Sequence, residues 1–158
     1  MNKVIFFVAG GTGGHLFPAI AVAKSFEKSQ SHFLVDKRTE KILLGKELKY
    51  HVISSSKLEK NLFTIIISIF KILHGFIYSF CLILKFKPSL VVGFGGYTSI
   101  PTILAAKVLN KKILIHEQNS VMGRTNRFLS KISTKIAITY KNTIFAHKSA
   151  ILSGIPIR

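Results

Sequence analysis

Short runs of consecutive apolar residues recur along the chain, separated by segments that are mostly long enough for helices. Continuous apolar runs, unlike alternating ones, are typical of strands buried on both faces of a parallel sheet. We predict seven strands, at Lys3–Ala9, Phe33–Val35, His51–Ser54, Ser89–Val92, Lys112–His116, Lys135–Thr139 and Ala150–Ser153. Strands alternating with helices predict an α/β fold with a doubly wound, Rossmann-like parallel sheet, which binds ligands beyond the C-terminal ends of its strands.

The segment Leu62–Leu84 is almost continuously apolar. Its length permits a membrane span. Lys71 and His74 near its middle argue against one, because a central charge is costly in lipid. Three interpretations stay open: a long helix that covers the sheet, the same helix with one face in the membrane interface, and a true span. Flanking lysines at positions 57, 60, 85 and 87 suit the first two.

Composition sets the class of protein. At 158 residues and 48% hydrophobic content, the chain fits one domain with a substantial core and is not disordered. Its single cysteine, Cys81, predicts a reducing compartment. We expect no secretory signal, since a glycine loop follows the first apolar run too soon for a signal-peptide cleavage region.

The charge is strongly positive: 23 Lys and Arg against 6 Asp and Glu, a net charge of +17. After Lys60, Glu117 is the only acidic residue. The basic residues are scattered, and the chain carries no helix-turn-helix, zinc-finger or aromatic RNA-binding signature, so we expect no nucleic-acid partner. Scattered lysines beside apolar surface favour an anionic membrane surface.

The most informative stretch is a glycine loop directly after the first strand. Gly10, Gly11, Gly13 and Gly14 surround Thr12 and precede His15 and a helical pattern. Strand, glycine turn and helix together aim free N–H groups and a helix dipole at an anion, so we predict a phosphate or diphosphate ligand. The loop lacks the Lys-Ser/Thr of a P-loop and the third glycine of the dinucleotide fingerprint. Asp36, about twenty residues on, keeps a ribose-binding role open.

A second glycine loop follows the strand at Ser89–Val92. Three of the four residues 93–96 are glycine, Tyr97 comes next, and a helix begins near Pro101. Because parallel strands end at one edge of a sheet, Gly95 and Gly96 are expected to face the first loop across a cleft.

The third polar stretch, His116-Glu117-Gln118-Asn119, follows another strand. A zincin motif would need a second histidine at position 120, which is Ser120, so we expect no metal. Beyond it, the stretch 123–127 opens another helix, and its Arg124 and Arg127 suit either phosphate or solvent.

Four segments together resemble a known family. These are residues 9–23 (AGGTGGHLFPAIAVA), 92–106 (VGFGGYTSIPTILAA), 116–126 (HEQNSVMGRTN) and 154–158 (GIPIR). They closely resemble the family 28 glycosyltransferases of bacterial peptidoglycan synthesis, which transfer N-acetylglucosamine from UDP-N-acetylglucosamine to lipid I and so form lipid II. Ile155 departs from the family's usual Gly-Asn-Pro.

The resemblance implies that residues 1–158 form the N-terminal, acceptor-binding half of a glycosyltransferase-B fold, without the C-terminal donor-binding domain. Either a separate polypeptide supplies that donor domain or the chain is a fragment. The resemblance also implies peripheral attachment to the cytoplasmic face of the inner membrane, and a part in cell-wall biogenesis, cell shape and division. The alternatives are a non-catalytic lipid-diphosphate-binding fragment or gene remnant, and a membrane-recruiting subunit of a split glycosyltransferase.

The implied reaction inverts the anomeric centre and needs a base and a stabilised leaving diphosphate, but no cofactor. His15 is the first candidate base, or a phosphate binder, and Glu117 is the alternative base or a residue that orients the acceptor. Candidates for cradling the lipid diphosphate are Gly13, Gly14, Gly95, Gly96 and Tyr97. From the family pattern, Thr12, Gly13, Gly14, Asn119 and Arg158 would touch the nucleotide sugar, and Gln118 and Asn126 complete the predicted substrate-binding set.

Overall fold

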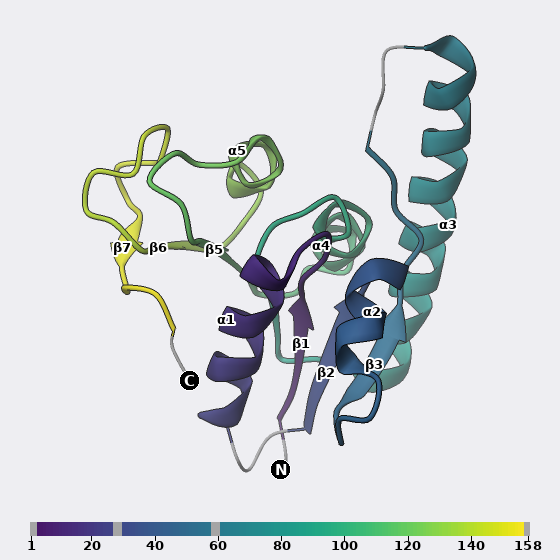
Figure 1. The fold of residues 1–158 in the computed structure, drawn as a ribbon, viewed down its shortest axis with the longest axis horizontal. Helices are drawn as coiled ribbons and strands as arrows, with labels where there is room; N and C mark the ends of the chain where they lie inside the picture. Colours follow the sequence, from purple (N-terminus) through teal and green to yellow (C-terminus); the bar gives the residue numbers. More distant parts are fainter. Residues whose placement is uncertain (1–2, 27–29, 58–60, 157–158) are drawn as a thin grey trace.

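A computed structural model describes residues 3–26, 30–57 and 61–156. Seven parallel strands form one sheet in the order β3-β2-β1-β4-β5-β6-β7 (Figure 1). The strands are β1 (Val4–Val8), β2 (Gln30–Val35), β3 (Lys49–Val52), β4 (Leu90–Gly93), β5 (Ile113–Glu117), β6 (Lys135–Ile138) and β7 (Ile151–Leu152). All seven predicted strands are confirmed, with β2 and β3 beginning a few residues earlier than the apolar pattern indicates.

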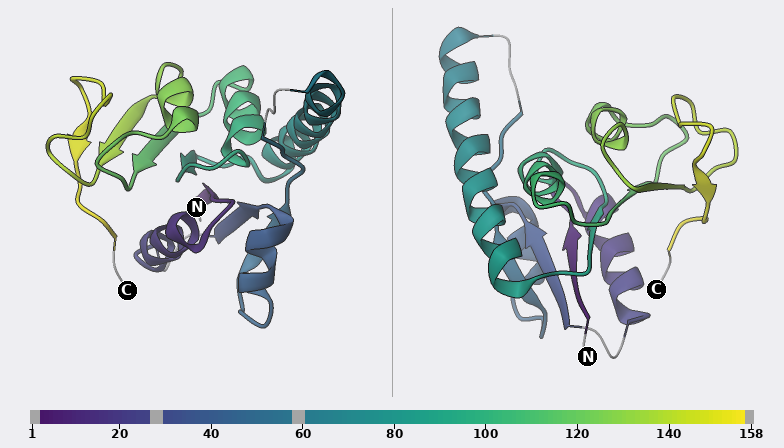
Figure 2. Two further views of the ribbon diagram at one scale, coloured as in Figure 1. Left: turned by 45° about the horizontal axis from the view of Figure 1, so that its top comes forward. Right: turned by 180° about the vertical axis from the view of Figure 1, so that it is seen from behind.

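In the part of the chain that the structure describes, five helices cover the two faces of the sheet. They are α1 (Gly13–Lys24), α2 (Lys37–Leu43), α3 (Leu62–Phe86), α4 (Ser99–Val108) and α5 (Arg124–Ser130). Figure 2 shows α3, α4 and α5 on one side of the sheet and α1 and α2 on the other. This confirms the doubly wound α/β architecture.

Alternate residues of the central strands point into two cores. Phe6 and Val8 of β1 face α3 and α4, whereas Phe7 faces the α1 side with Phe33 and Leu16. All five side chains are fully buried. Burial on both faces is the physical reason why β1 is continuously apolar.

The long helix α3 covers the sheet with its C-terminal half and extends past it with its N-terminal half (Figure 1). Leu82 and Ile83 are buried in the core, and Ser79 shares a 2.8 Å hydrogen bond with Thr102 of α4. At Gly75 a Cβ would overlap the Ser54 carbonyl oxygen, so only glycine permits this close approach. Within the described residues, α3 is the one helix long and apolar enough to cross a membrane. Its packing matches the interpretation of a covering helix.

Two histidines pair between the neighbouring strands β2 and β3. Nδ1 of His32 on β2 lies 3.0 Å from Nε2 of His51 on β3, and both rings lie against Phe86. Burial, His51 and then Lys49 lower the pKa of His32 to about 4, and burial and then Lys85 lower the pKa of His51. Folding therefore disfavours protonation of both rings.

This pair predicts acid sensitivity. The folded protein binds fewer protons at these two rings than the unfolded chain does. The free energy of unfolding is therefore unaffected by the pair above pH 6.5 and falls as the pH drops toward 4. We expect roughly 1–3 kcal/mol of unfolding free energy to be lost over that window. In urea unfolding at both pH values, His32→Phe should flatten this dependence and the exposed-site control His147→Ala should not. An unchanged acid loss in His32→Phe would contradict the assignment.

Candidate active site

Three polar loops meet at the C-terminal edge of β1, β4 and β5, which are neighbours in the sheet. Val8, Gly93 and Ile115 lie side by side in the strand register. The strand order reverses between β1 and β4, and ligands of open α/β sheets bind at such a reversal. The expectation that the two glycine loops share one edge is confirmed, but the loops pack directly against each other at Gly10 and Gly96 and do not face each other across a cleft.

The first loop turns at Gly11, whose φ is +86°, and α1 begins at Gly13. Thr12 is the N-cap residue, but its side chain makes no capping hydrogen bond to the helix. The first N–H groups of a helix have no intrahelical partner, so those of Gly13 and Gly14 are placed to meet an anion at the positive end of the dipole. Thr12 and Gly14 are exposed.

The second loop packs directly against the first. Gly95 and Gly96 have φ values of +100° and +78°. A Cβ on Gly96 would overlap the carbonyl oxygen of Gly10, and one on Gly95 would lie 3.1 Å from Nε2 of His15. The Ser99 hydroxyl donates to the Gly95 carbonyl at 2.8 Å and fixes the far side of the turn. Glycine is therefore required here by both backbone conformation and contact.

A matched pair of substitutions tests this contact. Gly96→Ala adds a positive-φ penalty and an overlap with Gly10, and we expect it to cost roughly 2–4 kcal/mol of unfolding free energy. Gly45→Ala has a similar φ of +76° but open space around its Cβ, so only about 1–2 kcal/mol should be lost. Chemical denaturation measures both. Equal losses would show that the contact between the two glycine loops does not contribute to the free energy of unfolding.

His15 lies where the two glycine loops meet. Its Nδ1 is 3.0 Å from the Gly10 carbonyl oxygen and 3.3 Å from the Thr12 hydroxyl. Its other nitrogen, Nε2, faces Gly95: a Cβ on Gly95 would lie 3.1 Å from this nitrogen and 3.4 Å from the side-chain amide nitrogen of Asn126. With Nδ1 donating to the carbonyl, Nε2 is left as a proton acceptor.

Glu117 at the end of β5 is 1% exposed. Its Oε1 accepts hydrogen bonds from the backbone N–H and the side-chain amide of Asn119, at 2.9 and 2.8 Å. Its Oε2 accepts from the Gly123 N–H at 3.0 Å and from the Asn126 amide at 2.8 Å. All four donors belong to the 118–126 segment, so the carboxylate holds that loop and the start of α5 in place.

His116 and Gln118 form a second buried group beside it. His116 Nε2 donates to the Gly154 carbonyl at 3.2 Å, and the Gln118 amide lies 3.1 Å from His116 Nδ1. Burial lowers the pKa of His116, partly offset by the Gly154 hydrogen bond and the nearby Glu117. Within the described residues, the buried side-chain oxygens of Gln118 and Asn126 have no hydrogen-bond partner. Neither oxygen has appreciable solvent-exposed surface.

The other predicted residues lie around this centre. Tyr97 is 41% exposed at the edge of the second loop, and the Asn119 side chain is turned toward Glu117. Arg158 lies outside the described residues. In α5, Arg124 and Arg127 line an open surface depression with Phe128 and Lys131. In the part of the chain that the structure describes, no three His, Cys, Asp or Glu side chains are placed to hold a metal ion.

Sequence reasoning missed the main contact of Asp36. Its carboxylate caps α2 and accepts from the Gly11 N–H at 2.7 Å and the Thr98 hydroxyl at 3.3 Å. It therefore binds the protein's own loops, in place of the ribose contact that its spacing left open. The signal in the sequence is an N-cap Asp immediately after a strand, ahead of a short helical segment.

The sheet order, the glycine loops at its reversal and the histidine between them define a Rossmann-like α/β domain with a candidate anion site. The model of the glycosyltransferase family 28 N-terminal domain matches residues 5–138, and the chain belongs to this family.

The relatives make the likeness more specific. The UDP-N-acetylglucosamine--N-acetylmuramyl-(pentapeptide) pyrophosphoryl-undecaprenol N-acetylglucosamine transferases of Bartonella bacilliformis and Rickettsia bellii are each 39% identical to this chain, over 99% and 97% of its length. The crystal structure of Acinetobacter baumannii MurG superposes with a TM-score of 0.81 at 33% identity, over 98% of this chain. The chain spans 43%, 44% and 46% of these three proteins.

More distant structures share the fold alone. The UDP-GlcNAc 2-epimerase of Methanocaldococcus jannaschii matches with a TM-score of 0.67 at 17% identity, over 89% of this chain. The expected glycosyltransferase-B half is thereby confirmed as a fold.

Proposed function

We propose that this chain provides the acceptor-binding half of an N-acetylglucosaminyltransferase of peptidoglycan synthesis. The donor is UDP-N-acetylglucosamine, the acceptor is lipid I and the product is lipid II. The names of the similar transferases support the substrates, and the family match supports the half of the enzyme. A donor-binding domain, joined to this chain or separate, completes the site.

One observation carries the proposal: His15 lies between both glycine loops with Nδ1 held by Gly10 and Nε2 directed over Gly95. In the proposed step, Nε2 takes the proton of the acceptor hydroxyl while its oxygen bonds to the anomeric carbon. The bond from that carbon to the donor diphosphate breaks, and its electron pair leaves with UDP. A neutral imidazole suits this role near neutral pH.

The backbone of the two loops provides the anion site. The Gly13 and Gly14 N–H groups at the start of α1 meet a diphosphate, and Gly95 and Gly96 let its oxygens approach the second loop without a side chain in the way. Gln118 and Asn126 complete the proposed substrate-binding set. Thr12, Asn119 and Tyr97 complete the edge of the site, with Arg158 beyond the described residues.

A transfer assay with radiolabelled UDP-N-acetylglucosamine and a lipid I analogue tests the function. The chain is assayed alone and then with a separately produced C-terminal half of one of the transferase relatives. We expect lipid II only in the mixture. A folded chain that binds lipid I but gives no product in either assay would contradict the transferase role and indicate a lipid-diphosphate-binding module.

We also propose that α3 and α5 attach the protein to the cytoplasmic face of the inner membrane. The outward face of α3 is apolar, with Phe63 and Phe70 71% and 67% exposed, whereas its inward face carries Ser68, Gly75 and Ser79. Leu82 and Ile83 near the C-terminal end of α3 pack into the core, so the outward face is a second apolar face that the core does not cover. Such a surface is stabilised by insertion into a lipid interface.

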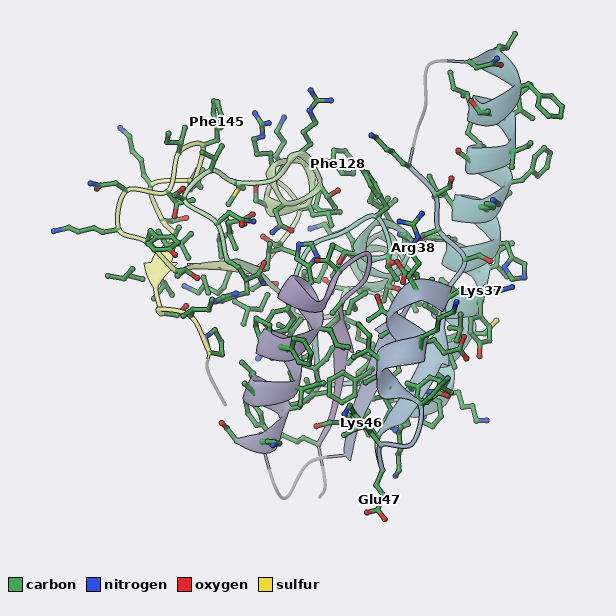
Figure 3. The ribbon with its side chains drawn as sticks, in the orientation of Figure 1. Lys37, Arg38, Lys46, Glu47, Phe128 and Phe145 are labelled. Carbon is green, nitrogen blue, oxygen red and sulfur yellow. The ribbon has the colours of Figure 1, made fainter. Side chains whose placement is uncertain are left out.

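The region around α5 adds positive charge and aromatic surface at the same end of the molecule. Figure 3 shows Phe128 and Phe145 at the end toward which α3 extends. The Arg127 guanidinium lies 4.3 Å from the centre of the Phe145 ring, and Arg124 and Lys131 lie beside Phe128. Cations beside exposed aromatic rings suit the headgroup region of an anionic membrane.

Vesicle binding should therefore depend on both salt and apolar contact. We expect binding to anionic vesicles to weaken as salt rises from 0.1 M toward 1 M, where the screening length falls from about 10 Å to about 3 Å. Phe70→Ser should weaken binding further, whereas Leu44→Ser, at a 62% exposed position beyond α2, should not. Salt-resistant attachment that only detergent releases would point instead to a membrane-spanning α3.

A further inference from the structure

The two carboxylate oxygens of Asp36 have separate partners. Oδ1 accepts from the backbone N–H groups of Arg38 and Thr39 and from the Thr39 hydroxyl, at 3.1, 2.8 and 2.8 Å. These are contacts of an ordinary helix N-cap. Oδ2 is turned away from α2, toward Gly11 and Thr98 in the two glycine loops. Capping of α2 explains the hydrogen bonds of Oδ1 but not those of Oδ2.

One peptide unit connects Asp36 with His15. The N–H of Gly11 donates to Asp36 Oδ2 at 2.7 Å, and the carbonyl of Gly10, in the same peptide unit, lies 3.0 Å from His15 Nδ1. The peptide is planar, so fixing its N–H direction also fixes the direction of its carbonyl. Hydrogen bonds in series polarise one another, and the carboxylate makes this carbonyl a better acceptor.

Packing prevents this peptide from turning over. A Cβ on Gly10 would overlap the Thr98 hydroxyl and lie 3.1 Å from Asp36 Oδ2. A Cβ on Gly96 would overlap the carbonyl oxygen of Gly10, so this carbonyl lies against the second loop. Thr98 itself is 1% exposed and shares a 3.3 Å hydrogen bond with Ser55. The peptide is thus held from both loops as well as from Asp36.

We propose that Asp36 is a positioning residue that sets the tautomer and orientation of His15 through the Gly10–Gly11 peptide. The carboxylate holds the peptide N–H, the carbonyl takes the His15 Nδ1 proton as a hydrogen bond, and Nε2 stays unprotonated and directed over Gly95. The catalytic meaning of this arrangement rests on the proposed transferase function. The link between Asp36 and the His15 tautomer is independent of it.

Nitrogen NMR of the neutral His15 ring in the 158-residue chain measures the tautomer directly. We expect the Nδ1–H form in the wild-type protein, whereas a free histidine favours Nε2–H. In Asp36→Asn, we expect the amide oxygen to stay with the three donors of the α2 cap, which turns the NH₂ group against the Gly11 N–H. The Nε2–H population should then rise severalfold. Asp36→Ser retains an N-cap oxygen, but its side chain is one atom shorter, and it should shift the ring in the same way.

Thr39→Val is the matched control, because it removes one hydrogen bond on the Oδ1 side and leaves Oδ2 untouched. It should keep the Nδ1–H form. An Nε2–H ring in the wild-type protein would overturn the proposal whether or not the variants fold. A retained Nδ1–H ring in both folded Asp36 variants would also overturn it.

The transfer assay separates this proposal from the proposed function. If both hold, Asp36→Asn lowers kcat roughly 10-fold or more, with a smaller change in KM for the acceptor. A tautomer that shifts in Asp36→Asn while His15→Ala leaves transfer intact would retain the positioning role and reject His15 as the base.

Discussion

His15→Ala is expected to lower kcat for N-acetylglucosamine transfer by about a hundredfold or more. General-base catalysis contributes about 10²- to 10⁴-fold, and the variant removes the group placed to take the acceptor proton. The Gly10 carbonyl and both glycine loops remain, so acceptor binding should change far less than turnover. The measurement is kcat and KM for a lipid I analogue, with the donor half of a transferase relative present.

His147→Ala is the control for His15, because His147 is an exposed histidine of the segment between β6 and β7. Its transfer rate should match that of the unaltered chain. A His15→Ala variant that loses only acceptor affinity, with kcat preserved, would make His15 a phosphate ligand and exclude it as the base.

Glu117→Gln is expected to destabilise the fold by roughly 2–4 kcal/mol. The amide keeps one acceptor oxygen but places an NH₂ group against two of the four donors that now bind the carboxylate. Buried hydrogen bonds to a charged group are worth about 1.5–3 kcal/mol each, and donors left without a partner add to the cost. For a chain of this size, thermal unfolding should shift downward by about 5–15 °C.

The control is Glu47→Gln, an exposed carboxylate that Figure 3 labels at the opposite end of the molecule from the loops. Its effect should stay within about 0.5 kcal/mol. If Glu117→Gln instead unfolds at the wild-type temperature and loses turnover, Glu117 serves as the base and the loop does not depend on its charge.

The sequence allowed the sheet and its loops to be predicted because both follow from local patterns. A strand buried on both faces must be apolar throughout, and a close backbone approach requires glycine, so β1, β4 and both glycine loops are visible in the residues themselves. Contacts made by single polar atoms over long sequence separations cannot be predicted from such local patterns. Asp36 reaches Gly11 and Thr98, 25 and 62 residues away, and no spacing rule predicts which carboxylate oxygen faces which loop.

Glu117 and α3 also make contacts that the sequence alone does not predict. The stretch from His116 to Asn119 is visibly polar at a strand end, but its role depends on where the donors of Gly123 and Asn126 fall in three dimensions. For α3, composition shows an apolar helix and not which face is buried. The structure turns Ser68 and Ser79 inward and Phe63 and Phe70 outward, opposite to what hydrophobicity alone indicates.

The seam between β1 and β4, where His15 meets Gly95, has a consequence for how the molecule assembles. It joins residues far apart in the chain: Ser89 donates to the Val4 carbonyl across 85 positions. Closing so long a loop is entropically costly, and contacts of high sequence separation form late in folding. A nascent chain can pair β1 with β2 long before β4 exists. We therefore expect the β1–β4 seam, and the site on it, to form after the β1–β2 pair.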